Sequence, residues 1–303
     1  MLPCDLQVNG YGGVDFNSDT LTAAQMELAC AQLVADGVGQ FLATVITDHV
    51  PVMCARLARL AAYYGELPHI QDCLIGLHVE GPFLNPADGY RGAHPRDAIL
   101  PADVSSMEQL LVAGNGLVRL VTLAPEADDQ LRVTRFLAER NVCVAAGHTD
   151  ASRAQLRAAA AAGCTLFTHL GNGCPALLPR HDNIIQRVLA LREHFLVTLI
   201  ADGAHVPFFV LENYLRLIGI DRAIVVSDAI APAGLGPGDY TLGRWQLRIG
   251  PDLVARSPDG GHLVGSAVGL TLAAKRLSTE TSLEPGDILR LTTLNPRSVL
   301  DPR

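Results

Sequence analysis

The sequence has little positive charge and no long apolar run, and both absences exclude classes of protein. Acidic residues outnumber Lys and Arg by 31 to 23, which gives a formal net charge of −8. Nucleic-acid binders usually present a basic stripe, so no nucleic-acid partner is expected. No apolar stretch approaches the ~20 residues of a membrane span, and no signal segment opens the chain. We therefore expect a cytoplasmic protein with no membrane partner.

The sequence also lacks the paired cysteines of a disulfide-stabilised fold. Its seven cysteines are odd in number, scattered along the chain and mostly set within apolar runs. Buried free thiols in a reducing compartment are the interpretation that this pattern favours, with disulfides as the alternative.

No linker, break in composition or short internal repeat divides the chain. Its 303 residues are 49% hydrophobic and 18% charged, which is enough apolar material for a barrel and the helices around it. We predict a single domain over residues 1–303.

Short apolar runs alternate with longer amphipathic segments, a pattern typical of βα units and a parallel sheet. Eight strands with interleaved helices predict a (β/α)₈ TIM barrel. A Gly/Pro-rich stretch then leads into a predicted hairpin over 240–256. The predicted strands are 4–9, 40–46, 73–79, 117–123, 142–146, 164–168, 195–200 and 222–227. The predicted helices are 21–36, 51–64, 103–113, 127–140, 151–162, 184–193, 207–217 and 267–279.

Polar side chains that can bind metal or move protons follow several of these strands. They are Gln7, Asn9, Glu80, His148, His169 and Asp228. Barrel enzymes build their active sites at the carboxyl ends of the strands. Taken singly, each of these residues could instead cap a helix or satisfy a loop. Together, two imidazoles and one carboxylate match an open metal site of the zinc-hydrolase type.

Eight motifs in order resemble the N-acetylglucosamine-6-phosphate deacetylases, a family of the amidohydrolase superfamily, from residue 5 to about residue 300. The motifs are Asp5-Leu6-Gln7-Val8-Asn9-Gly10, Gly76-Leu77-His78-Val79-Glu80-Gly81-Pro82-Phe83, Gly92-Ala93-His94, Ala146-Gly147-His148-Thr149, Thr168-His169-Leu170-Gly171-Asn172, Ala201-Asp202-Gly203-Ala204-His205, Ser227-Asp228-Ala229 with Ala231-Pro232-Ala233-Gly234, and Leu263-Val264-Gly265-Ser266.

The resemblance implies hydrolytic removal of the acetyl group from an N-acetylated amino-sugar 6-phosphate. It assigns the metal to Glu80, His148 and His169, and the acid/base role to Asp228. His94 would touch the sugar and polarise the amide carbonyl. The implied substrate-binding residues are Ala93, His94, Asn172, Gly173, Arg180, His205, Leu263, Val264 and Gly265. Among these, Arg180 and His205 would meet the phosphate, and His205 could do so across a homodimer interface.

The scarcity of lysine bears on the number of metal ions. Lys275 is the only lysine and falls in a predicted late helix, whereas many binuclear amidohydrolases bridge two ions through a modified lysine on a middle strand. The first strand offers Gln7 and Asn9 where a His-x-His pair would hold a second ion. We therefore expect one divalent ion, Zn²⁺, with Fe²⁺, Mn²⁺ or Co²⁺ as alternatives.

Three features depart from the family pattern. The small β-sandwich domain is expected to be absent, the loop after the sixth strand carries Gly171 and Gly173-Cys174, and the 85–92 loop is long and weakly basic. There are therefore two alternative functions: an amidohydrolase for an unphosphorylated N-acyl substrate, or a truncated, non-catalytic paralogue that binds a sugar phosphate.

The remaining histidines are expected to be solvated or structural. They are His49, His69, His181, His194 and His262.

Overall fold

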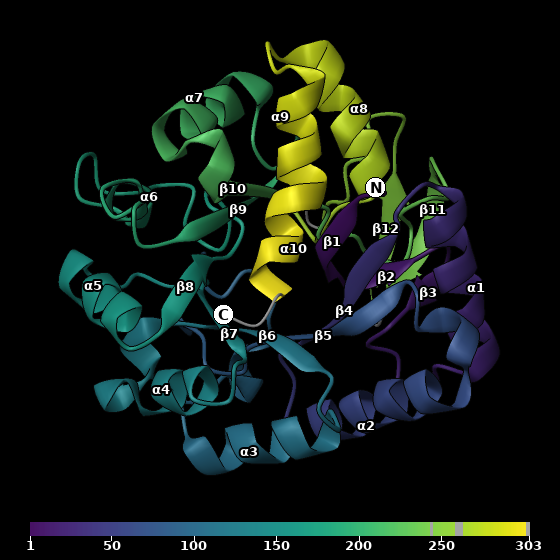
Figure 1. The fold of residues 1–303 in the computed structure, drawn as a ribbon, viewed down its shortest axis with the longest axis horizontal. Helices are drawn as coiled ribbons and strands as arrows, with labels where there is room; N and C mark the ends of the chain where they lie inside the picture. Colours follow the sequence, from purple (N-terminus) through teal and green to yellow (C-terminus); the bar gives the residue numbers. More distant parts are fainter. Residues whose placement is uncertain (243–244, 258–262, 301–303) are drawn as a thin grey trace.

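A computed structural model describes residues 1–242, 245–257 and 263–300. Eight parallel strands lie side by side in the order β1, β4, β5, β6, β7, β8, β9, β10 (Figure 1). Their bounds are Cys4–Val8, Gln40–Ile46, Leu74–Glu80, Val118–Leu123, Cys143–Ala146, Cys164–Phe167, Leu196–Ile200 and Ala223–Val226. Each lies within one or two residues of a predicted strand. The predicted eight-stranded parallel barrel is confirmed.

Polar contacts hold the seam between β1 and β10, where the barrel is almost closed. The Ser227 amide donates to the Asp5 carboxylate at 3.2 Å, and the Ser227 hydroxyl donates to the Gln7 carbonyl at 3.3 Å. Val8, at the end of β1, forms an isolated parallel bridge with Ala229, which lies beyond β10. The seam therefore brings the first and last strands together beside the predicted site.

Helices on the outside of the barrel connect the strands (Figure 1). Several begin at side-chain caps, including capping boxes at Thr22 and Ser152 that satisfy the first free amides of α1 and α5. The helices are α1 (Ala23–Ala35), α2 (Val50–Glu66), α3 (Val104–Ala113), α4 (Arg132–Ala138), α5 (Arg153–Ala161), α6 (Ile184–Leu189), α7 (Phe208–Ile218) and α8 (Leu270–Glu280). All eight overlap predicted helices.

A further helical segment closes one end of the barrel. α9 (Pro285–Leu289), a π-helical turn (Arg290–Leu294) and α10 (Asn295–Leu300) were not predicted from the sequence. α10 crosses the centre of the ring of strands in Figure 1. Val299 and Leu300 pack against the apolar barrel interior, which includes Leu6, Leu42 and Leu120. The amino ends of the strands are thus covered, and the open mouth lies at their carboxyl ends.

Two short hairpins follow the first and last barrel strands. β2 (Gly10–Tyr11) pairs with β3 (Val14–Asp15), and this hairpin was not predicted. β11 (Gly238–Leu242) pairs with β12 (Trp245–Ile249), and this hairpin overlaps the one predicted over 240–256 but begins two residues earlier. Ile249 and Ile230 share a small apolar cluster, which anchors the second hairpin beside the mouth.

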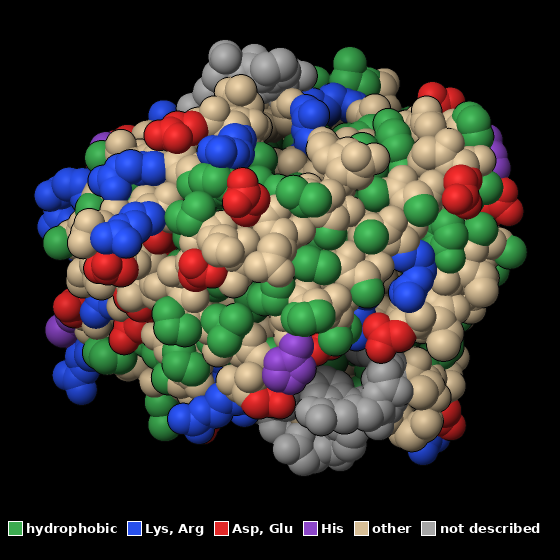
Figure 2. All heavy atoms as spheres, turned by 90° about the horizontal axis from the view of Figure 1, so that it is seen from below, with side chains coloured by type: hydrophobic (Ala, Val, Ile, Leu, Met, Phe, Trp, Pro, Cys, Tyr) green, Lys and Arg blue, Asp and Glu red, His purple; other side chains and the backbone are tan. Residues whose placement is uncertain are grey.

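Charged side chains of both signs are interspersed with hydrophobic ones on the face of the molecule shown in Figure 2. Such mixing is typical of solvent-facing helices. In the described part of the chain, no helix combines the length and apolar character that crossing a membrane requires.

Replacing Leu120 with alanine tests the packing of the barrel interior. Leu120 is 1% exposed, so Leu120→Ala should lower the free energy of unfolding by about 2–5 kcal/mol through lost burial and a residual cavity. Val112 is 74% exposed, and Val112→Ala should stay within about 0.5 kcal/mol of the parent. Urea denaturation compares the two variants, and equal losses would contradict the assigned core.

Candidate metal centre

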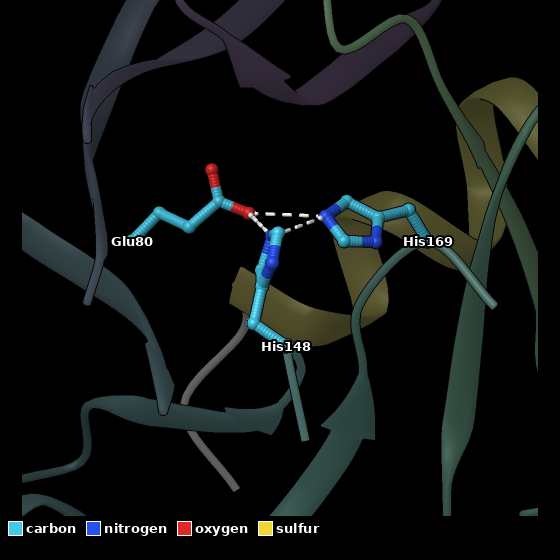
Figure 3. Close-up of side chains that lie close together, drawn as sticks. All are labelled: Glu80, His148 and His169. Carbon is cyan, nitrogen blue, oxygen red and sulfur yellow. Dashed lines mark hydrogen bonds and ion pairs between the residues drawn. The ribbon is translucent and has the colours of Figure 1, made fainter. Parts of the chain in front are cut away.

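Three side chains from different strand ends meet at the mouth of the barrel. Glu80 ends β5, His148 follows β7, and His169 follows β8. The Nε2 atoms of the two histidines lie 3.1 Å apart, and Glu80 Oε1 lies 3.3 Å from His148 Nε2 and 3.1 Å from His169 Nε2 (Figure 3). All three residues are buried and could together hold a metal ion. The structure therefore brings together the three predicted ligands.

The donor geometry fits a divalent ion. Ligand atoms about 2.0–2.1 Å from a tetrahedral ion lie about 3.3 Å from one another, close to the separations found here. His148 Nδ1 lies 2.8 Å from the Tyr90 carbonyl oxygen, which can only accept. Nδ1 must therefore carry the hydrogen, and in the neutral ring Nε2 directs its lone pair at Glu80. A lone pair facing a carboxylate requires a cation or a proton between them.

The protonation of Glu80 and His169 points the same way. Burial opposes ionisation of Glu80, but hydrogen bonding to His148 and His169 outweighs burial and holds the Glu80 pKa well below its usual value. Burial also opposes a charge on His169, and its contacts with Glu80 reverse this effect and raise its pKa. The Glu80 carboxylate therefore stabilises positive charge between these three side chains, and a metal ion would supply that charge.

The backbone holds three site residues in the left-handed region. φ is 50° at His148, 33° at His169 and 51° at Asp228. Non-glycine residues adopt such values at a cost of about 1–3 kcal/mol each, and they concentrate at functional sites. Each turn directs its side chain into the mouth at the point where the strand ends.

Asp228 lies beside the cluster without joining it. Its Oδ1 accepts hydrogen bonds from Asn9 Nδ2 at 2.7 Å and from Gln7 Nε2 at 3.1 Å. Gln7 Nε2 also lies 3.1 Å from Glu80 Oε1, so one amide spans both carboxylates. Burial raises the pKa of Asp228, and the nearby Glu80 carboxylate adds to this rise. Asp228 therefore holds a proton more readily than an exposed aspartate does.

His94 lies beside the three candidate ligands. Its ring meets the His148 ring edge-on with centroids 4.5 Å apart, and its Nδ1 has no hydrogen-bond partner. Burial lowers the pKa of His94 to about 3, and the neighbouring His148 contributes. Gly173 lies close to the His148 ring, where an added Cβ would approach His148 Nδ1 to 2.8 Å. A neutral imidazole and a bare backbone thus line the cavity beside His148.

A cavity of about 970 Å³ contains nearly all of the predicted site residues. The predicted site residues that line it are Glu80, Ala93, His94, His148, His169, Asn172, Gly173, His205, Asp228, Leu263, Val264 and Gly265. Arg180 is the exception. Its side chain is exposed on the loop after β8 and does not line the cavity.

The mouth also contains residues that the sequence analysis did not assign to the site. His49, which was expected to be solvated or structural, lines the cavity, and its Nε2 lies 3.8 Å from the Asp97 carboxylate. Arg56 and Arg91 line it too, along with Asp15, Asp48, Asp88 and Asp97. Most of these residues lie on the loops that follow β4 and β5, whereas Arg56 lies on α2 and Asp15 ends β3, so no single local pattern marked them. His262 lies outside the described residues.

A polar layer lies beneath the ligands inside the barrel. His78 Nε2 lies 2.8 Å from the Thr122 hydroxyl, which lies 2.8 Å from the Thr168 hydroxyl beside His169. Burial lowers the pKa of His78 to about 4. The His169 amide donates to Thr198 at 2.6 Å. This layer fixes the backbone on which Glu80 and His169 stand.

Comparison with known proteins identifies the family. The chain is 30% identical over 299 residues to the N-acetylglucosamine-6-phosphate deacetylase of Bacillus subtilis, covering 97% of this chain and 74% of that protein. The chain belongs to the N-acetylglucosamine-6-phosphate deacetylase family. Another relative is the N-acetylgalactosamine-6-phosphate deacetylase of Escherichia coli, 29% identical over 98% of this chain and 76% of that protein. No protein-family model matches the sequence.

Solved deacetylase structures share the fold as well. A mutant of the Mycobacterium smegmatis deacetylase in complex with N-acetyl-D-glucosamine-6-phosphate has a TM-score of 0.87 and 28% identity, covering 99% of this chain and 77% of that chain. The structure from Pasteurella multocida has a TM-score of 0.85 at 24% identity and covers 76% of that chain. The barrel is therefore the deacetylase barrel.

Metal analysis tests the three-residue centre. We predict one tightly held divalent ion per chain, and a His148→Ala/His169→Ala double variant should lose it because a single carboxylate remains. Elemental analysis after gel filtration measures the ratio of metal to protein, and His69→Ala, outside the cavity, serves as the control. Two tightly held ions per chain, or an ion retained by the double variant, would contradict the assignment.

The buried Asp5 carboxyl predicts a pH effect on stability. Burial raises its pKa to about 7, above the ~3.9 of an unfolded chain, so the folded protein binds more protons between these values. The contribution of Asp5 to the free energy of unfolding is therefore fully present below about pH 4. It is lost as the pH rises to about 7, by at most about 1.4 kcal/mol per pH unit.

Asp5→Asn removes this contribution and should flatten the fall in stability over this window. Urea denaturation of the metal-loaded protein from pH 5 to 8 measures it, with exposed Asp221→Asn as the control. An unchanged slope in the Asp5 variant would show that Asp5 does not titrate in this range.

Proposed function

We propose that this chain hydrolyses the acetamide of an N-acetylated amino-sugar 6-phosphate, releasing acetate and the free amine. N-acetylglucosamine-6-phosphate would give glucosamine-6-phosphate, and the E. coli relative makes the galactosamine epimer a second substrate to test. The observation that carries the proposal is the arrangement of Glu80, His148 and His169 around one point, with Asp228 and His94 beside it in the same cavity.

Glu80, His148 and His169 would hold one divalent cation. Their nitrogen and oxygen donors suit Zn²⁺, and Fe²⁺, Mn²⁺ or Co²⁺ also accept such a set. When bound, the cation supplies a Lewis acid that polarises a carbonyl group and makes water acidic near neutral pH. The Tyr90 carbonyl orients His148 for this role by fixing which of its nitrogens carries the hydrogen.

Asp228 would move the proton. Its carboxylate takes a proton from the attacking water and returns it to the leaving nitrogen, so that the amine departs neutral. Hydrogen bonds from Gln7 and Asn9 fix Oδ1 and leave Oδ2 for this transfer. The raised pKa of Asp228 favours the first step, because it makes the carboxylate a stronger base toward the attacking water.

His94 would stabilise the oxygen of the amide as negative charge develops on it. A neutral ring retains one N–H, and its buried Nδ1 has no partner within the described chain. A donor already held in the cavity requires little reorganisation during reaction. Ala93 and Gly173 would place the substrate by close backbone approach, and Asn172 would do so through its side chain.

The phosphate would be met by His205, which lines the cavity. Arg180 would reach a phosphate only if its loop moves or if it enters the cavity of a second copy of the chain. A homodimer therefore stays part of the proposal. Leu263, Val264 and Gly265 would cover the substrate from the segment that follows the β11–β12 hairpin.

The charge of the cavity favours a second candidate, an unphosphorylated N-acyl substrate. Four carboxylates line the mouth besides Glu80 and Asp228, against two guanidinium groups. Arg56 is already paired with Asp19 and Asp48, and Arg91 is paired with Asp88. This net negative charge would repel a phosphate dianion but would not repel a neutral sugar.

Acetate release on a panel of substrates separates the two candidates. The metal-loaded protein is offered N-acetylglucosamine-6-phosphate, N-acetylgalactosamine-6-phosphate and both unphosphorylated sugars. The main proposal expects kcat/KM at least about tenfold higher on a 6-phosphate than on its unphosphorylated counterpart, as one charge-assisted contact allows. Equal values would favour the second candidate, and no acetate from any member would reject both.

Replacing Asp228 with asparagine tests its role in proton transfer. Asp228→Asn keeps the shape of the side chain but cannot accept the proton, so kcat should fall at least ~10²-fold while metal content and KM stay near the parent. Steady-state kinetics with elemental analysis measures both. Loss of the metal would make Asp228 mainly a ligand, and a near-parental kcat would contradict the mechanism.

A further inference from the structure

Asp202 and His205 form a buried pair at the edge of the cavity. His205 Nδ1 lies 2.6 Å from Asp202 Oδ2, and the two side chains are 8% and 3% exposed. Burial alone would raise the pKa of Asp202, but hydrogen bonds from His205 lower it to about 2. Asp202 is therefore ionised, and its oxygen accepts the hydrogen of Nδ1.

Asp202 is itself held from several directions. Its Oδ1 accepts the backbone amides of Ala204 and His205 at 2.9 and 2.8 Å. Its Oδ2 accepts the Ser266 hydroxyl at 3.0 Å. Arg276 donates to its backbone carbonyl at 2.6 Å. The carboxylate therefore has one fixed position, and it fixes the His205 ring in turn.

The pairing determines what His205 can offer to a ligand. With the Nδ1 hydrogen committed to Asp202, Nε2 is the ring nitrogen left for the cavity. Nε2 donates a hydrogen bond only when the ring carries a proton on both nitrogens, that is, as a cation. A cation with one free N–H is suited to an anionic oxygen. The charged groups that face this pair are Asp228, across the cavity, and Arg276.

We propose that Asp202 is a positioning residue for the anionic end of the substrate, which holds the His205 ring with Nδ1 on Asp202 and Nε2 free for a phosphate. The inference rests on the proposed function and goes further, because it locates phosphate recognition in a pair within one chain. Asp202 acts only through His205.

The pair is also joined to the segment that would cover the substrate. Ser266 follows Leu263, Val264 and Gly265, and its amide donates to the Asp228 carbonyl at 2.9 Å. The Ser266 hydroxyl meets the same Asp202 oxygen as His205. Asp202 therefore contacts two neighbours, His205 and Ser266, and a double-variant cycle with His205 distinguishes its action through each.

Asp202→Asn is the direct test. The amide nitrogen of asparagine would face His205 Nδ1 as a donor, which favours the opposite tautomer and removes the neighbouring negative charge. KM for the 6-phosphate substrate should rise about tenfold or more, with kcat and the turnover of the unphosphorylated sugar changed less than about threefold. Exposed Asp221→Asn, the same change at the opposite end of the barrel, should match the parent.

A double-variant cycle asks whether Asp202 acts through His205. In a His205→Gln background, Asp202→Asn should produce no further rise in KM for the phosphorylated substrate. An equal rise in both backgrounds would overturn the inference, and so would an equal loss on phosphorylated and unphosphorylated substrates.

Spectra of the parent protein do not require the Asp202 variant to fold, and calorimetry does not require deacetylase activity. Nitrogen-15 spectra of the parent protein should show hydrogen on Nδ1 of His205, and an unprotonated Nδ1 would overturn the inference. Calorimetry with glucose 6-phosphate, which has no amide, should give a Kd about tenfold weaker in folded Asp202→Asn. A parent that binds this probe but releases no acetate would reject the proposed function and leave the pair in place. If the protein is a deacetylase but its KM for the 6-phosphate substrate is unchanged in Asp202→Asn, the proposed function stands and the role of Asp202 is rejected.

Discussion

Three potential ligand atoms from separate strand ends are held 3.1–3.3 Å apart, and the rest of the site depends on this constraint. Glu80, His148 and His169 come from strands β5, β7 and β8, so only a closed barrel brings them to one point. The left-handed backbone at His148 and His169 turns the rings inward, and the packed interior beneath them stabilises that strain. A bound cation would offset part of this strain energy, because it would neutralise the carboxylate that lies between two imidazoles.

The same constraint separates binding from proton transfer. Gln7 donates to both Glu80 and Asp228, so it holds the proposed metal ligand and the proposed proton carrier side by side. The two carboxylates have pKa values displaced in opposite directions, Glu80 downward by its histidine partners and Asp228 upward by burial. Two carboxyl groups in one cavity can therefore take different roles, as an anion that holds charge and as a base that exchanges a proton.

The strand-end pattern predicted much of this arrangement. Glu80, His148, His169 and Asp228 each follow an apolar run, and the fold rule that carboxyl ends share one face placed them together. Arg180 was assigned to the phosphate through the family resemblance alone, and its side chain lies outside the cavity because the loop after β8 carries it outward. His49 and Arg91 were missed because they lie on the loops that follow β4 and β5, and no local spacing records the path of these loops along the cavity. The helices over 285–300 were also missed, since their apolar face is defined only by the barrel end that Val299 and Leu300 cover.

The central claim is that one cation lies between the three predicted ligands of this deacetylase-family chain. Anomalous diffraction from crystals grown with zinc, recorded on either side of the zinc absorption edge, tests it most directly. The account predicts one peak, about 2.0–2.2 Å from Glu80 Oε1 and from Nε2 of both His148 and His169. A peak elsewhere in the cavity, a second peak of equal height, or no peak between these atoms would contradict it.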